Sequence, residues 1–238
     1  MKKIGIICAL VREKEQLVSR LDTCHVVHSG PLEFVWGNLN ECEIILLQSG
    51  IGKVNAALGT LEMIKHFAPD FIISSGVAGG LQDSLNVLDS VIGTQYAYHD
   101  VWCGEGNEYG QVQELPTFFP ADNTLLSAAE KLHFQDPRVV HKGLICSGDQ
   151  FVSGEEPVAR ILQHFPLALA CDMESAAIAQ TCYRYKVPFL SIRLISDVVG
   201  KEQTNMDQYK NFWSTMSDTG FKRLWQLLGV LTGEVSGE

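Results

Sequence analysis

The strongest constraint on the fold is a regular alternation, along the whole chain, of short apolar runs with longer segments of helical periodicity. Several apolar runs are continuous stretches of Ile, Val and Leu, which is typical of strands buried on both faces of a sheet. The predicted strands are residues 3–9, 24–27, 33–36, 43–49, 71–75, 90–98, 142–147, 167–171 and 188–195. The predicted helices are residues 12–21, 54–67, 123–132, 157–164, 174–185 and 206–228. This order indicates an α/β protein in which helices cover a mostly parallel sheet.

The length of 238 residues allows one large domain or two small ones. No linker, internal repeat or low-complexity stretch divides the chain. Hydrophobic residues make up 46% and charged residues 19%, which favours a large core over disorder. We therefore expect one domain over residues 1–232, followed by a frayed tail over residues 233–238.

The sequence also bears on the compartment. No segment approaches the roughly 18 apolar residues that span a bilayer. The N-terminus has a charged head and a short apolar run, as a signal peptide would, but residues 11–15 follow at once without a small-residue cleavage site. The seven cysteines are odd in number, include no C-x-x-C pair and lie partly within apolar runs. We expect a cytoplasmic protein with reduced thiols, and neither a structural zinc nor another metal.

The charge balance limits the partners. The chain has 18 Lys and Arg against 28 Asp and Glu, which gives a net charge of −10 with no basic block. A nucleic-acid-binding surface is therefore not expected, and neither is a membrane partner.

Carboxylates follow three of the predicted strands. Glu13 comes after the first strand, Glu174 after the eighth and Asp197 after the last. Each carboxylate by itself could have only a structural role in its helix or in the core. In open α/β sheets, however, ligands bind at the carboxyl ends of the strands, so we expect the three carboxylates to lie together at that edge of the sheet. A position in a first helical turn favours ionised Glu13 and Glu174, and an ionised Glu174 can accept hydrogen bonds from sugar hydroxyls. Burial at a strand end would raise the pKa of Asp197 and allow it to act as an acid.

Other signals are weaker by themselves. The glycine-rich turns at residues 49–53 and 76–80 match neither the dinucleotide fingerprint nor the Walker A motif, so a tight turn explains them as well as a ligand cradle does. The pair His99-Asp100 could be catalytic, although such a histidine more often caps a strand and bonds locally. Residues 100–120 form a long aromatic-rich segment without clear structure, which favours an interface or pocket role over a plain surface loop.

Taken in order, the strand-end motifs resemble one family. They are Ile4-Gly5-Ile6-Ile7-Cys8-Ala9-Leu10 with Glu13, Ser49-Gly50-Ile51-Gly52-Lys53-Val54, Gly76 with Gly79-Gly80, Tyr98-His99-Asp100, Glu108-Tyr109-Gly110-Gln111, Ser147-Gly148-Asp149 with Phe151, Met173-Glu174, and Arg193 with Ile195-Ser196-Asp197. From residue 3 to about residue 228 the chain resembles the 5′-methylthioadenosine/S-adenosylhomocysteine nucleosidases of the nucleoside phosphorylase superfamily. No single motif is specific, but the ordered set is.

The resemblance implies a three-layer α/β domain of the nucleoside phosphorylase type, with a mixed central sheet flanked by helices. It implies hydrolysis of the N-glycosidic bond of adenine nucleosides such as 5′-methylthioadenosine and S-adenosylhomocysteine, by a homodimer without a cofactor. Glu13 is similar to the base that activates water, and Asp197 to the acid that protonates purine N7. Glu174 is similar to the ligand of the ribose hydroxyls, with the Met173 backbone beside it.

The remaining roles also follow from the resemblance. Phe151 is expected to stack on the purine and the Val152 backbone to read the adenine edge. Ser196 is similar to a residue that helps to position the base, and Arg193 to an electrostatic organiser of the carboxylates. The other expected substrate-binding residues are Ile51, Val77, Ala78, Gly79 and Met206.

The residue types suit this chemistry. Cleavage of a glycosidic C–N bond passes through an oxocarbenium-like cation. Because adenine leaves poorly as an anion, N7 must be protonated, so Asp197 must hold a proton while Glu13 must not. An acid or base of this kind contributes about 10²–10⁴-fold to the rate.

Alternatives remain open at this point. A phosphorylase needs a phosphate cradle, usually of arginines, and related phosphorylases carry an arginine just before the glycine-rich turn, where residues 73–76 here read Ile-Ser-Ser-Gly. This favours water over phosphate as the nucleophile. A non-catalytic nucleoside-binding protein is a remoter alternative, and a Rossmann-type cofactor enzyme lacks its fingerprint.

The chain also departs from the family pattern. Asp172 stands where many relatives have Glu, and Val77 where Ser or Thr is frequent. The lid segment 204–209 has no Phe to place against the ligand, which leaves Met206 and Tyr209 as candidates. The loop 102–107, which reaches a neighbouring subunit's site in the family, carries Glu and Asn where the 5′-thioalkyl pocket is usually apolar. The 5′ substituent is therefore open, and a polar or acidic one, as in aminodeoxyfutalosine, is an alternative.

Overall fold

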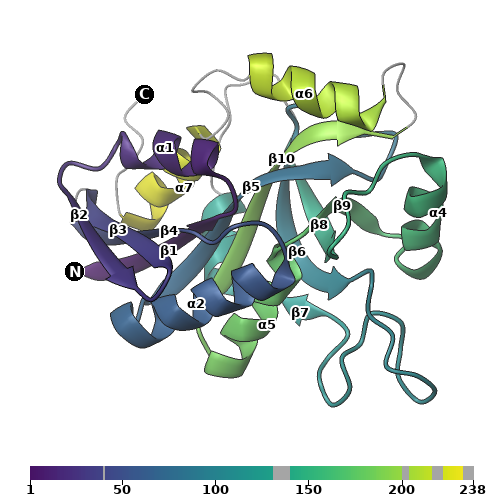
Figure 1. The fold of residues 1–238 in the computed structure, drawn as a ribbon, viewed down its shortest axis with the longest axis horizontal. Helices are drawn as coiled ribbons and strands as arrows, with labels where there is room; N and C mark the ends of the chain where they lie inside the picture. Colours follow the sequence, from purple (N-terminus) through teal and green to yellow (C-terminus); the bar gives the residue numbers. More distant parts are fainter. Residues whose placement is uncertain (40, 131–139, 200–203, 216–221, 233–238) are drawn as a thin grey trace.

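The computed structural model describes residues 1–39, 41–130, 140–199, 204–215 and 222–232 (Figure 1). Its strands are β1 (Lys2–Cys8), β2 (Cys24–Ser29), β3 (Leu32–Leu39), β4 (Cys42–Gln48), β5 (Phe71–Gly80), β6 (Ser90–Tyr98), β7 (Phe119–Pro120), β8 (Val140–Ser147), β9 (Ala168–Asp172) and β10 (Phe189–Val198). Its helices are α1 (Val11–Val18), α2 (Lys53–Phe67), α3 (Asn123–Glu130), α4 (Glu155–His164), α5 (Ser175–Tyr185), α6 (Asn205–Thr215) and α7 (Lys222–Thr232). The alternation expected from the sequence is confirmed.

The described strands pair in one sheet with two internal directions. Strands β1, β4, β5 and β10 run parallel to one another, and β6, β8 and β9 form a second parallel set. The two sets meet in antiparallel pairs, β10 with β6 and β5 with β9, while β2, β3 and β4 form an antiparallel meander. The expected parallel strands are present, but antiparallel pairs join them in a mixed sheet, because a continuous apolar run reports burial on both faces but not direction. The mixed sheet implied by the family resemblance is confirmed.

The course of β5 explains how distant segments meet. Its first half pairs with β1, and its last two residues, Gly79 and Gly80, pair with Cys171 and Ala170 of β9. Since β10 lines its other side, the pairings β5–β10–β6–β8–β9–β5 close a ring. Strands β5 and β9 point towards each other and overlap only at their carboxyl ends. The carboxyl ends of the two parallel sets therefore converge head to head, not along one edge of a parallel sheet.

The helices form the outer layers. Figure 1 shows α2 and α5 along one side of the sheet, where they pack against each other, and α1 and α7 along the other. Helix α6 lies on β10, where the Gln208 side chain accepts a hydrogen bond from the Val198 backbone N–H at 3.1 Å and donates one to its carbonyl at 2.9 Å. No helix in the described ranges has the length and apolar character needed to cross a membrane.

Some predicted boundaries differ. The helix expected over residues 206–228 is two helices, α6 and α7, since each segment is periodic by itself and periodicity alone does not separate them. The helix expected over 123–132 is described up to Glu130, and the tail 233–238 lies outside the described residues. The short strand β7, inside the long segment 100–120, was not predicted, because two residues are too few for a pattern.

Candidate active site

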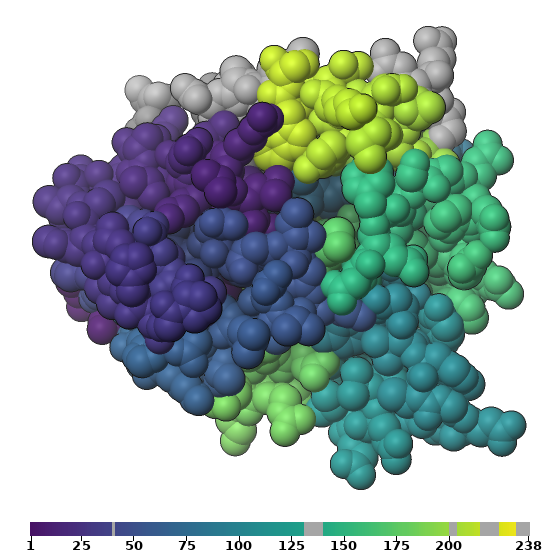
Figure 2. Space-filling model, in the orientation of Figure 1, coloured from purple at the N-terminus to yellow at the C-terminus, as the bar shows by residue number. Residues whose placement is uncertain are grey.

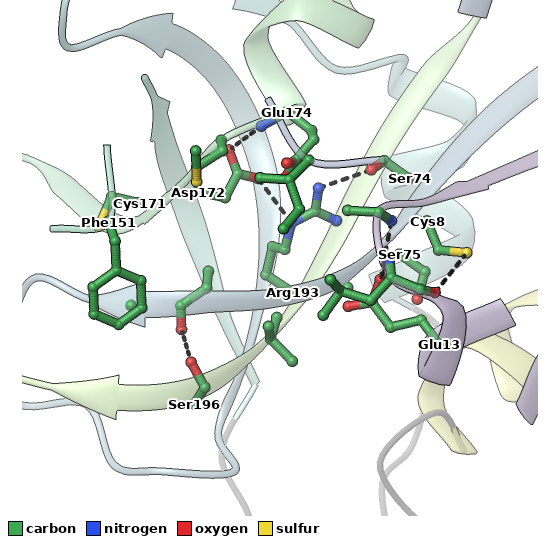
Figure 3. A pocket seen from close by; sticks show the side chains of 18 of the residues that line it. Cys8, Glu13, Ser74, Ser75, Phe151, Cys171, Asp172, Glu174, Arg193 and Ser196 are labelled. Atoms are coloured by element: carbon green, nitrogen blue, oxygen red, sulfur yellow. Dashed lines mark hydrogen bonds and ion pairs between the residues drawn. The ribbon is translucent and has the colours of Figure 1, made fainter. Parts of the chain in front are cut away.

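A cleft opens where the two sets of strand ends meet. Its walls come from the end of β1, the first turn of α1, the turn after β4, the second half of β5, the loop after β8, the β9–α5 junction, the end of β10 and α6. It encloses about 820 Å³ of atom-free space, counted to its open mouth. In the space-filling view the mouth lies where the N-terminal segment, α2, α4 and α6 approach one another (Figure 2). Close up, Arg193 lies between the Asp172–Glu174 pair and Glu13, with Phe151 on the far side (Figure 3).

Glu13 is a buried carboxyl group held by backbone donors. It is the third residue of α1, and its Oε2 accepts hydrogen bonds from the backbone N–H groups of Ala9 at 3.0 Å and Leu10 at 2.9 Å. Burial raises its pKa, and these donors, together with the Arg193 guanidinium, act in the opposite direction. The same contacts fix the carboxyl group against the floor of the cleft, so Glu13 is positioned to accept a proton there.

Asp197 reaches the cleft because β10 is irregular. The register against β5 shifts between Ile195 and Asp197, so Ser196 is an extra residue, and such a bulge lets neighbouring side chains share one face. The Asp197 carboxyl accepts hydrogen bonds from Ser196 Oγ and from Asn205 Nδ2, both at 2.7 Å. Opposite it stands Gly79, where a Cβ atom would lie 3.5 Å from Asp197 Oδ2. Burial raises the pKa of Asp197, which suits a proton donor.

Glu174 caps the start of α5 and is tied to another loop. Its Oε1 accepts a hydrogen bond from the Gly52 backbone N–H at 2.8 Å. Gly52 has φ of +97°, a conformation that L side chains rarely adopt. Burial, and then the Asp172 carboxylate, raise the pKa of Glu174 to about 7. The helix start was expected to keep Glu174 ionised by lowering its pKa. Burial raises the pKa by more than the helix dipole lowers it.

Arg193 and Asp172 form a buried ion pair behind the cleft. Arg193 Nε donates to Asp172 Oδ2 at 2.8 Å, and both side chains are almost fully buried. Arg193 also donates to Ser74 Oγ at 2.8 Å and to the Ile192 carbonyl oxygen at 3.2 Å. Ser147 Oγ donates to Asp172 Oδ1 at 2.5 Å, so the carboxylate is held on both oxygens. A pair held in this way has a fixed geometry and places one positive charge among three other carboxyl groups.

Aromatic side chains close the outer part of the cleft. The Phe151 ring is nearly half exposed and meets the Tyr209 ring edge to face, with centroids 5.6 Å apart. Val152, next along the loop, is buried. Tyr209 lines the cleft, whereas Met206, one turn earlier on α6, is exposed and does not. A flat apolar surface of this kind suits a planar base.

No group of three or more His, Cys, Asp or Glu in the described part of the chain has the arrangement of a metal site. The pair His99-Asp100 lies away from the cleft, and burial lowers the pKa of His99. Asp100 Oδ2 accepts hydrogen bonds from Lys53 Nζ at 2.6 Å and from the Asp149 backbone N–H at 2.9 Å. These local bonds are those of Asp100, whereas the buried Nε2 of His99 has no hydrogen-bond partner among the described residues.

Comparison with known proteins decides the family. The model of the phosphorylase superfamily matches residues 3–228. The 5′-methylthioadenosine/S-adenosylhomocysteine nucleosidase of Psychromonas ingrahamii is 43% identical over 214 residues, which cover 87% of this chain and 91% of the relative. The chain belongs to the 5′-methylthioadenosine/S-adenosylhomocysteine nucleosidase family.

Solved structures of this nucleosidase family share the fold over nearly the full length. The enzyme from Neisseria meningitidis, in complex with methylthio-immucillin-A, superposes with a TM-score of 0.90 at 37% identity and covers 98% of this chain and 100% of its own. The enzyme from Colwellia psychrerythraea, in complex with adenine, has a TM-score of 0.91 at 36% identity and covers 98% and 97%. The family expected from the sequence is confirmed.

Most residues predicted from the nucleosidase resemblance lie together. The predicted residues that line the cleft are Glu13, Ile51, Val77, Ala78, Gly79, Phe151, Val152, Met173, Glu174, Arg193, Ser196 and Asp197. Met206 is the exception, and Tyr209, its alternative on the same helix, takes a place in the wall. The individual roles of these residues stay predictions.

Sequence reasoning missed part of the nucleosidase site. Asn205 was noted only within the lid segment, yet its side chain donates to Asp197 and accepts a hydrogen bond from the Gly154 backbone N–H at 3.2 Å. Ser74 was noted only for the missing arginine, although a hydroxyl in a buried apolar strand is a signal for an internal polar partner. The segment 100–120 contributes no residue to the described cleft wall, and its interface or pocket role stays a prediction.

Proposed function

We propose that this protein hydrolyses the N-glycosidic bond of 5′-methylthioadenosine and S-adenosylhomocysteine, giving adenine and the free 5-substituted ribose. The observation that carries the proposal is that Glu13 and Asp197 line one cleft and are held by different hydrogen-bond donors. Burial raises the pKa of both carboxyl groups, and the donors that oppose it differ: backbone N–H groups of Ala9 and Leu10 at Glu13, and the Ser196 and Asn205 side chains at Asp197. Two carboxyl groups with separated roles are what acid–base cleavage of a glycosidic bond requires.

The proposed residue roles give the nucleoside one orientation in the cleft. The base would stack on Phe151 beside the Val152 backbone, with N7 towards Asp197 and Ser196. The ribose hydroxyls would donate to Glu174 beside Met173. The apolar residues of the turn after β4 and of β5 would contact the rest of the sugar; they are Ile51, Val77, Ala78 and Gly79.

The chemical step then needs one water molecule and one proton relay. Glu13 takes a proton from water as the oxygen attacks C1′, and Asp197 gives its proton to N7 as the C1′–N9 bond breaks. Neutral adenine and the sugar leave, after which a proton passes from Glu13 to solvent and Asp197 is reprotonated. Ser196 and Asn205 hold the Asp197 carboxyl in place during this transfer.

The state of Arg193 supports water over phosphate as the nucleophile. Among the described residues that line the cleft, Arg193 is the sole arginine and there is no lysine. Its donors are engaged by Asp172, Ser74 and the Ile192 carbonyl. A phosphate ion beside Glu13, Glu174 and Asp197 would meet carboxyl groups without a free guanidinium fork to bind it.

The decisive experiment is a product assay on purified protein, first without phosphate and then with it. Adenine and a reducing sugar formed without phosphate are the expected result, with S-adenosylhomocysteine, 5′-methylthioadenosine, aminodeoxyfutalosine, adenosine and inosine as the panel. Release that requires phosphate and yields a sugar 1-phosphate contradicts hydrolysis. Tight binding without base release points to a nucleoside-binding protein instead.

A homodimer acting in the cytoplasm is part of the same proposal. Val54 and Leu58 are more than half exposed one turn apart on α2, and Ile51 and Trp102 are also more than half exposed. The seven free cysteines, five of them buried, suit a reducing compartment. Light scattering on wild type and on Leu58→Glu tests the dimer: the variant should become monomeric, and an unchanged mass places the interface elsewhere.

A further inference from the structure

A second hollow adjoins the mouth of the cleft between α1 and α6. It is lined by Arg12, Tyr209, Lys210, Trp213 and Ser214. Tyr209 lines both the hollow and the cleft, so the two spaces share a wall. Figure 2 shows the N-terminal segment and α6 in contact on the face where the cleft opens. The hollow therefore borders the cleft at Tyr209.

The two spaces differ in their ionisable groups. The cleft wall carries Glu13, Asp172, Glu174 and Asp197 against the single cation Arg193. The described wall of the hollow carries two cations, Arg12 and Lys210, and no carboxyl group. Both cationic side chains are exposed, and no ion pair of either is found within the described ranges. In a chain of net charge −10, two free cations beside an acidic cleft form a local site for an anion.

Aromatic rings hold one of these cations in place. The Arg12 guanidinium lies over the Trp213 ring, 5.8 Å from its centroid. Trp213 meets Tyr209 edge to face at 6.0 Å, and Tyr209 meets Phe151 in the same way at 5.6 Å. A guanidinium group that stacks on a ring face uses its flat face for that contact. The N–H groups at its edge stay available to donate hydrogen bonds to a carboxylate.

The inference requires the 5′ substituent of the nucleoside to reach this hollow. This step rests on the proposed function, with the base at Phe151 and the ribose at Glu174. Leu10 is part of the cleft wall. Arg12 follows Leu10 by two residues in the first turn of α1, on the side of α6.

From these contacts we propose that Arg12 and Lys210 form a binding site for a carboxylate on the 5′ substituent. The protein would then discriminate among 5′-thioadenosines by the charge of the tail, and not only by its apolar part. The carboxylate of S-adenosylhomocysteine is one such group, whereas 5′-methylthioadenosine carries none. The Arg12 fork would make the directed hydrogen bonds, and the flexible Lys210 would add a point charge.

The test compares 5′-(3-carboxypropylthio)-5′-deoxyadenosine with its carboxamide, which has nearly the same shape and no charge. Wild type, Arg12→Gln, Lys210→Gln and the double variant are assayed for kcat/KM on both compounds and on 5′-methylthioadenosine. Arg12→Gln should lower kcat/KM for the carboxylate about tenfold, through KM, and change the two neutral substrates less than twofold. The carboxylate preference of wild type should also weaken with added salt.

Arg20→Gln is the matched control, because the Arg20 guanidinium also lies 5.8 Å from a tryptophan ring, that of Trp225, but outside the hollow. It should leave all three substrates unchanged. An equal loss on charged and neutral substrates in Arg12→Gln, or no loss on any, overturns the inference while hydrolysis itself stands.

Dissociation constants measured by calorimetry separate this inference from the proposed function. The same two compounds are titrated into Asp197→Asn protein, where turnover does not interfere, with and without Arg12→Gln. Tighter binding of the carboxylate that disappears with Arg12→Gln supports the site even if the wild type releases no adenine. Equal binding of both compounds overturns the inference.

Discussion

The backbone N–H of Gly52 donates a hydrogen bond of 2.8 Å to Glu174 Oε1, which joins the turn after β4 to the start of α5. The two residues are 122 positions apart in the chain. Gly52 is held at φ of +97°, and a Cβ atom there would lie 3.0 Å from Asp149 Oδ1. The turn therefore orients the carboxyl group that would hold the ribose, and it depends on glycine to do so.

Gly52→Ala should raise KM for 5′-methylthioadenosine about tenfold and change kcat less. The reason is that a strained, displaced turn loses its bond to Glu174, at about 1–2 kcal/mol. Gly106→Ala is the control, since Gly106 has φ of +88° with nothing within 4 Å of its Cβ position. It should share the loss of stability but keep the wild-type KM, and a similar KM in both variants would contradict the role given to Gly52.

Asp197→Asn should reduce kcat by about 10²–10⁴-fold, because the amide cannot give a proton to N7. Folding should be retained, since the amide oxygen can still accept from Asn205 Nδ2 and the amide NH2 can donate to Ser196 Oγ, whose hydroxyl also donates to the Ala78 carbonyl oxygen. Adenine release and a thermal melt provide the two readouts. Asp207→Asn is the control, an exposed carboxyl on α6 that bonds Thr204, and normal turnover is expected for it. Normal turnover in Asp197→Asn would refute the acid assignment.

Arg193→Met should destabilise the protein by about 3–5 kcal/mol, because it leaves the Asp172 carboxylate buried without its counter-charge. Urea denaturation measures the change. Arg160→Met removes the exposed pair with Glu156 and should change stability by less than about 1 kcal/mol. Equal losses in the free energy of unfolding for the two substitutions would mean that burial does not determine how much the Arg193–Asp172 pair contributes to stability.

The fold was predictable where a local pattern reports it. Continuous apolar runs located β1, β4 and β10 to within a few residues, and helical periodicity located α2 and α5. Strand direction was not predictable in the same way, because it depends on which distant strand a run pairs with. The two-residue overlap of β5 and β9 leaves no trace in periodicity, yet it brings the carboxyl ends together.

The site was predictable through its order of motifs, since Glu13, Glu174 and Asp197 each follow a strand and carry the family pattern. Asn205 and Tyr209 were harder to assign, because their contacts depend on how α6 lies across β10. The pKa of Glu174 could not be inferred from its helix position either. It depends on burial and on Asp172, both of which are products of the tertiary fold.

The raised pKa of Glu174 gives stability a definite dependence on pH. The folded protein keeps this carboxyl protonated to about pH 7, while in the unfolded chain it ionises near its ordinary value of 4.5. Between these two pH values the folded state binds more protons than the unfolded state, so the free energy of unfolding falls as the pH rises. Burial raises the pKa of Glu13 and of Asp197 as well, and both add in the same direction.

Melting temperatures between pH 5 and pH 8 should therefore decline, and Glu174→Gln should remove part of the decline because it cannot ionise. At pH 8 this variant should be more stable than wild type by about 1–3 kcal/mol, from the 1.4 kcal/mol that accompanies each pKa unit. Glu156→Gln, at an exposed position on α4, should follow the wild-type curve. If Glu174→Gln follows it too, burial does not govern the ionisation of Glu174. If the variant is more stable, as expected, and its KM for the nucleoside also increases, then the Glu174 carboxyl group serves substrate binding at a cost to stability.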